Sequence, residues 1–91
     1  MDKAKKHMEI CNKLNEIYKA KNHDYGDSFG ESFKEDGLIM AKIRLNDKFK
    51  RFKSLILCEG HVKEESIIDT LMDMANYAIM TVIELESKEA K

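Results

Sequence analysis

The chain has 91 residues, a formal net charge of −1, no proline and two cysteines without metal-type spacing. This length fits a single domain over residues 1–91, and a chain this small buries only about 60–65% of its surface on folding, so we expect a homo-oligomer. The near-neutral charge argues against direct nucleic-acid binding. The cysteine usage and the absence of an apolar leader predict a cytoplasmic protein, and no window approaches the roughly 20 apolar residues of a membrane-spanning helix.

The first predicted helix covers about residues 3–21. Its apolar residues recur at steps of three and four, which is the period of one helix face. They are Ala4, Met8, Cys11, Leu14 and Tyr18.

The next segment, KNHDYGDSFGESF over residues 21–33, carries two glycines and no apolar period, and we interpret it as a loop. Gly26 and Gly30 would let backbone N–H groups approach a phosphate, and Tyr25, Phe29 or Phe33 could stack on a base. The alternative is that Phe29 and Phe33 plug the end of a helical bundle, with both glycines serving as turns.

Two further helices follow, over about residues 38–57 and 64–87. The first of these has an apolar face and a basic run, RLNDKFKRFK. The second is apolar around most of its circumference, which indicates burial in a bundle or an oligomer. The predicted fold is therefore all-α, a three-helix unit forming a helical bundle that oligomerisation completes.

Acidic residues interrupt the apolar surface of the last helix. Glu65, Asp69 and Asp73 step by four and Asn76 follows by three, so these side chains share one face. Carboxylates in a row repel one another, and two kinds of compensation are open. One is Mg²⁺ held by Asp47, Asp69 and Asp73, because Mg²⁺ prefers hard oxygen ligands. The other is ion pairing of Asp69 and Asp73 with Arg44 and Arg51.

Three blocks, KNHDYGDSFGESFKEDGL, IRLNDKFKRFKSL and EESIIDTLMDMANYAIMTVIEL, together resemble the nucleotide modification associated domain 1 family. That family is common in phages and prophages, and the resemblance implies a role linked to nucleotide metabolism or base modification. The domain is also distantly similar to the all-α nucleoside triphosphate pyrophosphatases of the MazG type. Those enzymes hold Mg²⁺ with paired acidic residues on two helices, whereas the basic helix here offers Asp47 alone.

The resemblance leads us to expect a nucleotide-binding protein that acts as a Mg²⁺-dependent nucleoside phosphate hydrolase. The alternatives are a non-catalytic protein that sequesters a nucleotide against host defence, and a regulatory or docking subunit. The expected metal ligands are Asp47, Asp69 and Asp73. The expected nucleotide-binding residues are Lys21, Asn22, Asp24, Tyr25, Ser28, Arg44, Lys48, Arg51 and Asn76.

Overall fold

The computed structural model describes residues 1–58 and 64–89. It contains four α-helices, α1 (Lys3–Tyr25), α2 (Ser28–Asp36), α3 (Leu38–Leu57) and α4 (Glu64–Glu89). The prediction of an all-α fold is therefore confirmed, and the two predicted helices over 38–57 and 64–87 correspond to α3 and α4. The predicted three-helix unit is incomplete, because α2 is an additional helix.

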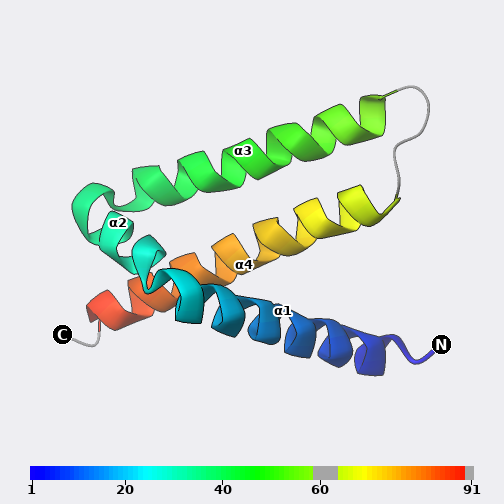
Figure 1. The fold of residues 1–91 in the computed structure, drawn as a ribbon, viewed down its shortest axis with the longest axis horizontal. Coiled ribbons are helices and arrows are strands. Elements are labelled where there is room, and N and C mark those ends of the chain that lie inside the picture. Colours follow the sequence, from blue (N-terminus) through cyan, green and yellow to red (C-terminus); the bar gives the residue numbers. More distant parts are fainter. Residues whose placement is uncertain (59–63, 90–91) are drawn as a thin grey trace.

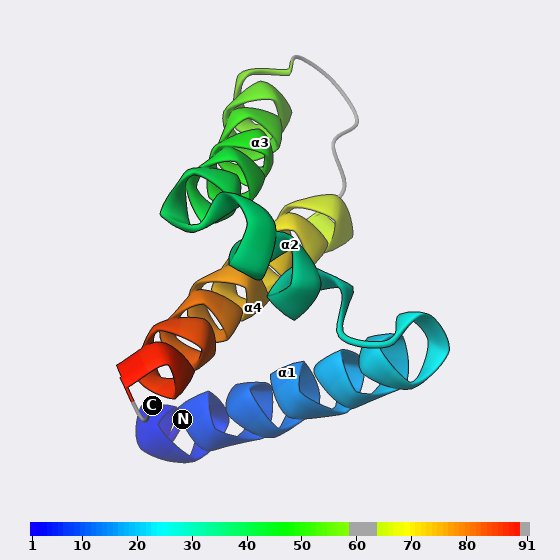
Figure 2. The ribbon, with the colours of Figure 1, turned by 90° about the vertical axis from the view of Figure 1, so that its left-hand side faces the viewer.

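The helices are arranged around α4. Figure 1 shows α3 and α4 as an antiparallel pair, with the short α2 at the end where α3 begins. Both views place α4 between α3 and α1, and α1 crosses α4 at an angle (Figures 1 and 2). The described chain has a radius of gyration of 14.9 Å and extents of 48 × 30 × 24 Å, so its shape is elongated.

The first helix is longer than its sequence predicts. The predicted range ends at about residue 21, but α1 continues for another turn to Tyr25. Gly26 then adopts φ 69°, a left-handed conformation that suits glycine, and its N–H donates to the Asn22 carbonyl at 2.8 Å. The real stop signal is therefore Gly26, and the residues before it project from a helix rather than from a loop.

The interpretation of residues 21–33 as a loop is wrong beyond Gly26 as well, because α2 begins at Ser28. Asp27 is the N-cap, and its carboxylate accepts a hydrogen bond from the Gly30 N–H at 3.2 Å. A Cβ on residue 30 would collide with that carboxylate, so Gly30 permits the cap rather than forming a turn. The signals for this helix were the Asp27 cap and the four-residue spacing of Phe29 and Phe33.

The buried core is small. Phe33 from α2 packs with Met40 and Ala41 from α3, and Phe29 and Leu85 cover this cluster. These contacts hold α2 against the start of α3 and the end of α4. A separate buried residue, Leu14, lies on α1.

Much of the predicted apolar surface remains exposed in the single chain. Along α1, residues 1–13 are all exposed, and Leu14 is the first buried position of the predicted stripe. Large apolar side chains are also exposed on α3 and α4. No helix in the described ranges is both long and apolar enough to cross a membrane.

We expect Phe33→Ala to lower the free energy of unfolding by about 3–5 kcal/mol, because it removes the largest side chain of the core cluster. Urea unfolding followed by circular dichroism measures this change. Tyr25→Ala is the control, since the Tyr25 side chain is 76% exposed and should contribute little to stability. Equal stabilities of the two variants would contradict the assignment of Phe33 to the core.

Candidate functional site

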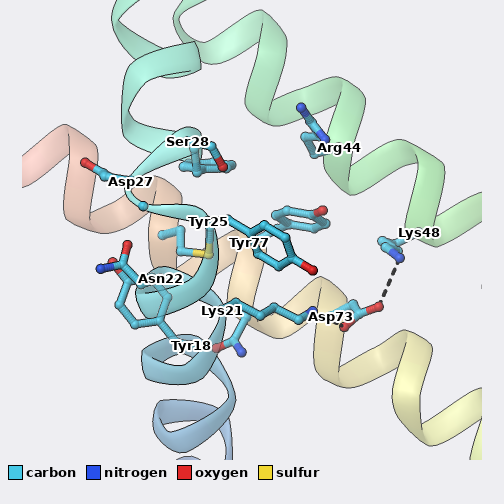
Figure 3. A pocket seen from close by; sticks show the side chains of 14 residues that line it. Tyr18, Lys21, Asn22, Tyr25, Asp27, Ser28, Arg44, Lys48, Asp73 and Tyr77 are labelled. Carbon is cyan, nitrogen blue, oxygen red and sulfur yellow. Dashed lines mark hydrogen bonds and ion pairs between the residues drawn. The ribbon is translucent and has the colours of Figure 1, made fainter.

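A cleft of about 210 Å³ opens where the end of α1, the α1–α2 junction, α3 and α4 come together (Figure 3). Residues from all of these segments line it. They are Tyr18, Lys21, Asn22, Tyr25, Gly26, Asp27, Ser28, Phe29, Arg44, Lys48, Asp73, Asn76, Tyr77 and Met80.

The last two turns of α1 supply one wall. Tyr18 and Asn22 are four residues apart, as are Lys21 and Tyr25, so all four project from one side of the helix. Gly26 ends the helix beside them, and the chain then turns into α2. The extra turn of α1, which the sequence did not predict, is therefore what places Tyr25 at the cleft.

Asp73 on α4 is the electrostatic centre of the cleft. Its carboxylate accepts a hydrogen bond from Lys48 Nζ on α3 at 2.9 Å, and Lys21 Nζ on α1 lies 3.6 Å from its other oxygen. Figure 3 shows the two lysines reaching Asp73 from opposite sides. The Asp73 and Lys48 side chains are 34% and 28% exposed, so this pair is partly shielded from solvent.

Arg44 lies one helical turn before Lys48 on the same wall of the cleft. Within residues 1–58 and 64–89 it forms no ion pair. The cleft therefore contains three basic side chains, of which two share the Asp73 carboxylate. The other acidic side chain that lines it, Asp27, is hydrogen-bonded to the N-terminus of α2. This balance leaves a net positive charge that suits an anionic ligand.

Aromatic side chains form the rest of the lining. The rings of Phe29 and Tyr77 stack with centroids 5.9 Å apart and an interplanar angle of 27°. Phe29 also packs against the core and Phe33 is part of it, so both phenylalanines have the plugging role that was one of the two alternatives. The ring most available for a ligand belongs to Tyr25, which is 76% exposed.

Asn76 joins α4 to α1. Its Nδ2 donates to the carbonyl oxygen of Leu14 at 3.2 Å, close to where the two helices cross. The side chain also lines the cleft, so one amide both ties α1 to α4 and forms part of the cleft wall.

Most of the predicted nucleotide-binding residues line the same cleft. The structure brings together Lys21, Asn22, Tyr25, Ser28, Arg44, Lys48 and Asn76. Two of the predicted residues do not line the cleft. Asp24 is exposed in the last turn of α1, with its carboxylate 3.4 Å from His23. Arg51 is exposed farther along α3.

The predicted metal ligands are not gathered at one point. Asp47 and Asp69 are exposed and lie outside the cleft, and the part of the chain that is described contains no group of three potential ligands close enough to hold a metal ion. A metal site built from Asp47, Asp69 and Asp73 therefore does not fit this arrangement. The alternative of ion pairing with Arg44 and Arg51 is not what the structure shows for Asp73, whose ionic partners are Lys48 and Lys21.

Several lining residues, among them Tyr18, Tyr77 and Met80, were not assigned to the site from sequence. Tyr18 was placed in an apolar stripe, and Tyr77 and Met80 lie on a helix that is apolar nearly all round, where periodicity cannot single them out. The available signal was spacing, because Asp73, Asn76, Tyr77 and Met80 follow one another at helical steps along one side of α4.

The fold and the cleft define a small all-α protein with a basic, aromatic-lined binding site. Residues 21–85 match the nucleotide modification associated domain 1 family, and the chain belongs to this family. The matched range contains every residue that lines the cleft except Tyr18. No curated protein and no solved structure is significantly similar to the chain.

We expect Asp73→Asn to lower the free energy of unfolding by about 1 kcal/mol, because two lysines lose a partly exposed ionic partner. The loss should be the same in EDTA and in Mg²⁺. Thermal unfolding in both buffers tests this.

The matched control is Asp69→Asn, one turn earlier on α4, where the carboxylate is exposed and has no ionic partner in the described ranges. It should change stability by less than about 0.5 kcal/mol. A destabilisation by Asp73→Asn seen only with Mg²⁺ would show that Asp73 is a metal ligand and contradict the lysine pairing as its main role.

Proposed function

We propose that the protein binds a nucleotide in this cleft. The observation that supports the proposal is the convergence of Lys21, Arg44 and Lys48 with the exposed ring of Tyr25 in one cavity. Basic side chains, arginine above all, suit phosphate oxygens, and a tyrosine ring suits the face of a base. Membership of a nucleotide-modification family is consistent with the same ligand class.

The size of the cleft limits how much of the ligand it can enclose. A volume of about 210 Å³ lies below the roughly 300–1,000 Å³ of sites that surround a whole drug-sized ligand. The cleft would therefore enclose only part of a nucleotide. We place the phosphate between Arg44 and Lys48 and the base against Tyr25 at the open side. The hydroxyl of Ser28 and the amide of Asn22 are available there for the sugar.

Binding without turnover is the form of the proposal that the acidic residues favour. The Asp73 and Asp27 carboxylates both have partners, two lysines and the α2 N-terminus respectively. Neither is positioned as an unengaged base or metal ligand. Such a protein would sequester a nucleotide, which is one of the roles expected from the sequence.

A Mg²⁺-dependent nucleoside phosphate hydrolase is the second candidate. The observation in its favour is that Asp73 stands at the basic end of the cleft, where a phosphate would bind. Mg²⁺ is often held by one or two carboxylates together with substrate phosphates. The described residues contain no group of three potential ligands, so an ion here would depend on the phosphates of the ligand for part of its coordination.

A calorimetric panel of nucleoside mono-, di- and triphosphates, in Mg²⁺ and in EDTA, tests the proposal. Nucleotides should bind more tightly than the corresponding nucleosides, because the basic side chains act on phosphate. Chromatography of the same mixtures separates the two candidates, since a binder returns the nucleotide unchanged and a hydrolase releases a shortened one. Failure of every nucleotide to bind in either buffer would refute the proposal.

Arg44→Ala should weaken nucleotide binding by about 1.5–3 kcal/mol, the usual contribution of a charge-assisted hydrogen bond, which is roughly a 10- to 150-fold rise in Kd. Arg51→Ala is the matched control, because Arg51 lies two turns farther along α3, is exposed and does not line the cleft. Its Kd should stay within about twofold of the unmodified protein. Equal losses in the two variants would indicate general attraction rather than a contact in the cleft.

A further inference from the structure

The single chain exposes more surface than a folded protein of its mass should. Its accessible surface is 7448 Å², whereas a monomer of 10.6 kDa is expected to expose about 5,500 Å². Its radius of gyration of 14.9 Å likewise exceeds the roughly 12 Å expected for a compact domain of 91 residues. The excess surface, about 2,000 Å², is comparable to what one subunit buries in an obligate dimer.

A large apolar part of this surface lies on α4. Ile68, Leu71, Ala75, Ala78 and Val82 recur at alternating steps of three and four, which is the spacing of a helix–helix seam. The side chains of Ile68, Leu71 and Val82 are 51%, 41% and 51% exposed. The two alanines at the centre of the row would let another helix approach closely.

The apolar surface continues onto α3. Leu38, Phe49 and Ile56 are about half exposed, at 56%, 47% and 55%. A shallow groove connects the two helices on this side, and its lining is mostly apolar, with Leu38, Leu45, Phe49 and Met74 beside the polar side chains of Lys42, Asn46 and Thr81. We call this groove, together with the α4 row from Ile68 to Val82 and the exposed α3 side chains Leu38, Phe49 and Ile56, the α3–α4 apolar face.

This face lies away from the nucleotide cleft. Along α3, the cleft residues Arg44 and Lys48 and the groove residues Leu45 and Phe49 lie on opposite sides of the buried Ala41. A partner covering the α3–α4 apolar face would therefore leave the cleft open.

We propose that a second copy of this chain covers the α3–α4 apolar face. The two α3–α4 pairs would pack face to face about a two-fold axis near Ala75 and Ala78 and form a four-helix bundle. One cleft would then lie on each outer side of the bundle. The seam on α4 contains no charged residue, and Lys42 is the one charged side chain among those that line the groove, so the face suits another apolar face better than a charged peptide. Acidic groups such as Glu65 and Glu86 and basic groups such as Lys42 and Lys53 both border it, so it carries no patch of a single sign for an anionic lipid surface.

Light scattering coupled to gel filtration of the full chain tests this at micromolar concentration. The expected mass is twice the 10.6 kDa of one chain. Ala78→Glu should raise the dimer dissociation constant at least about 100-fold, because the seam would bury an unpaired carboxylate from each copy. Ala20→Glu makes the same change at an exposed position on α1, outside the seam, and should leave the mass unchanged.

A crosslinking measurement keeps the test valid if Ala78→Glu fails to fold. In a background carrying Cys11→Ser and Cys58→Ser, Ala78→Cys should form a disulfide between copies on mild oxidation, and Ala20→Cys should not. A mass of one chain for the unmodified protein, or equal crosslinking at the two positions, would overturn the proposal. Binding of the unmodified monomer to apolar peptides or to vesicles would identify a different occupant.

The outcome is separable from that of the nucleotide proposal. A folded Ala78→Glu monomer should retain the nucleotide affinity of the dimer to within a few-fold, because every residue of the cleft comes from one chain. Loss of dimerisation with binding retained would support both proposals, whereas a dimer that binds no nucleotide would refute only the function proposed for the cleft.

Discussion

The cleft depends on the ion pairs that the Asp73 carboxylate forms with two lysines. Asp73 lies on α4, the helix that contacts all three others, and it pairs with Lys48 from α3 and Lys21 from α1. Without it, two ammonium groups and the nearby Arg44 guanidinium would face one another across a partly shielded cavity. If the cleft binds a nucleotide as proposed, the same carboxylate that orders these basic groups would compete with the incoming phosphate. Ligand affinity should therefore reflect how readily the lysines exchange one anionic partner for another, and Arg44, which has no partner of this kind in the described ranges, is the basic group that can engage first.

The end of α1 at Gly26 also determines the shape of the site. Its left-handed conformation allows α1 to stop after Tyr25, and Asp27 at once caps α2. The two elements meet at an abrupt corner, which brings the Tyr25 ring and the Ser28 hydroxyl to the same opening. Anchoring comes from Phe29 and Phe33, which secure α2 to the core. The corner is thus held by buried aromatic rings on one side and presents polar groups on the other.

The bounds of α3 and the start of α4 could be predicted because their apolar periods are strong and Gly37 interrupts the chain just before α3. The region between Asn22 and Asp36 could not, because its glycines and acidic residues are typical of loops. Whether Gly30 is a turn or a helical residue depends on the Asp27 side chain, which is a matter of local packing rather than composition. Lys21, Arg44, Lys48 and Asn76, which the family motifs brought together, all line one cleft, and their role in binding stays a prediction. Asp69 lies outside the cleft, because a row at four-residue spacing fixes which side chains share a face but not where along α4 the neighbouring helices lie close.

The structure carries a basic, aromatic-lined cleft on one side of α3 and α4 and an apolar face on the other, and the two differ in what they contribute to stability. Among the described residues only four apolar side chains are buried, Leu14, Phe33, Met40 and Ala41, so packing within one copy leaves much apolar surface uncovered. On the proposal that a second copy covers the α3–α4 apolar face, much of the missing stabilisation is supplied by assembly, which acts on the two helices that carry Arg44, Lys48 and Asp73. Assembly and ligand binding would then favour the same folded arrangement by mass action, even though they occupy opposite sides of α3 and α4. On this proposal the cleft can be small and carry several basic groups because much of the apolar stabilisation of its supporting helices lies elsewhere.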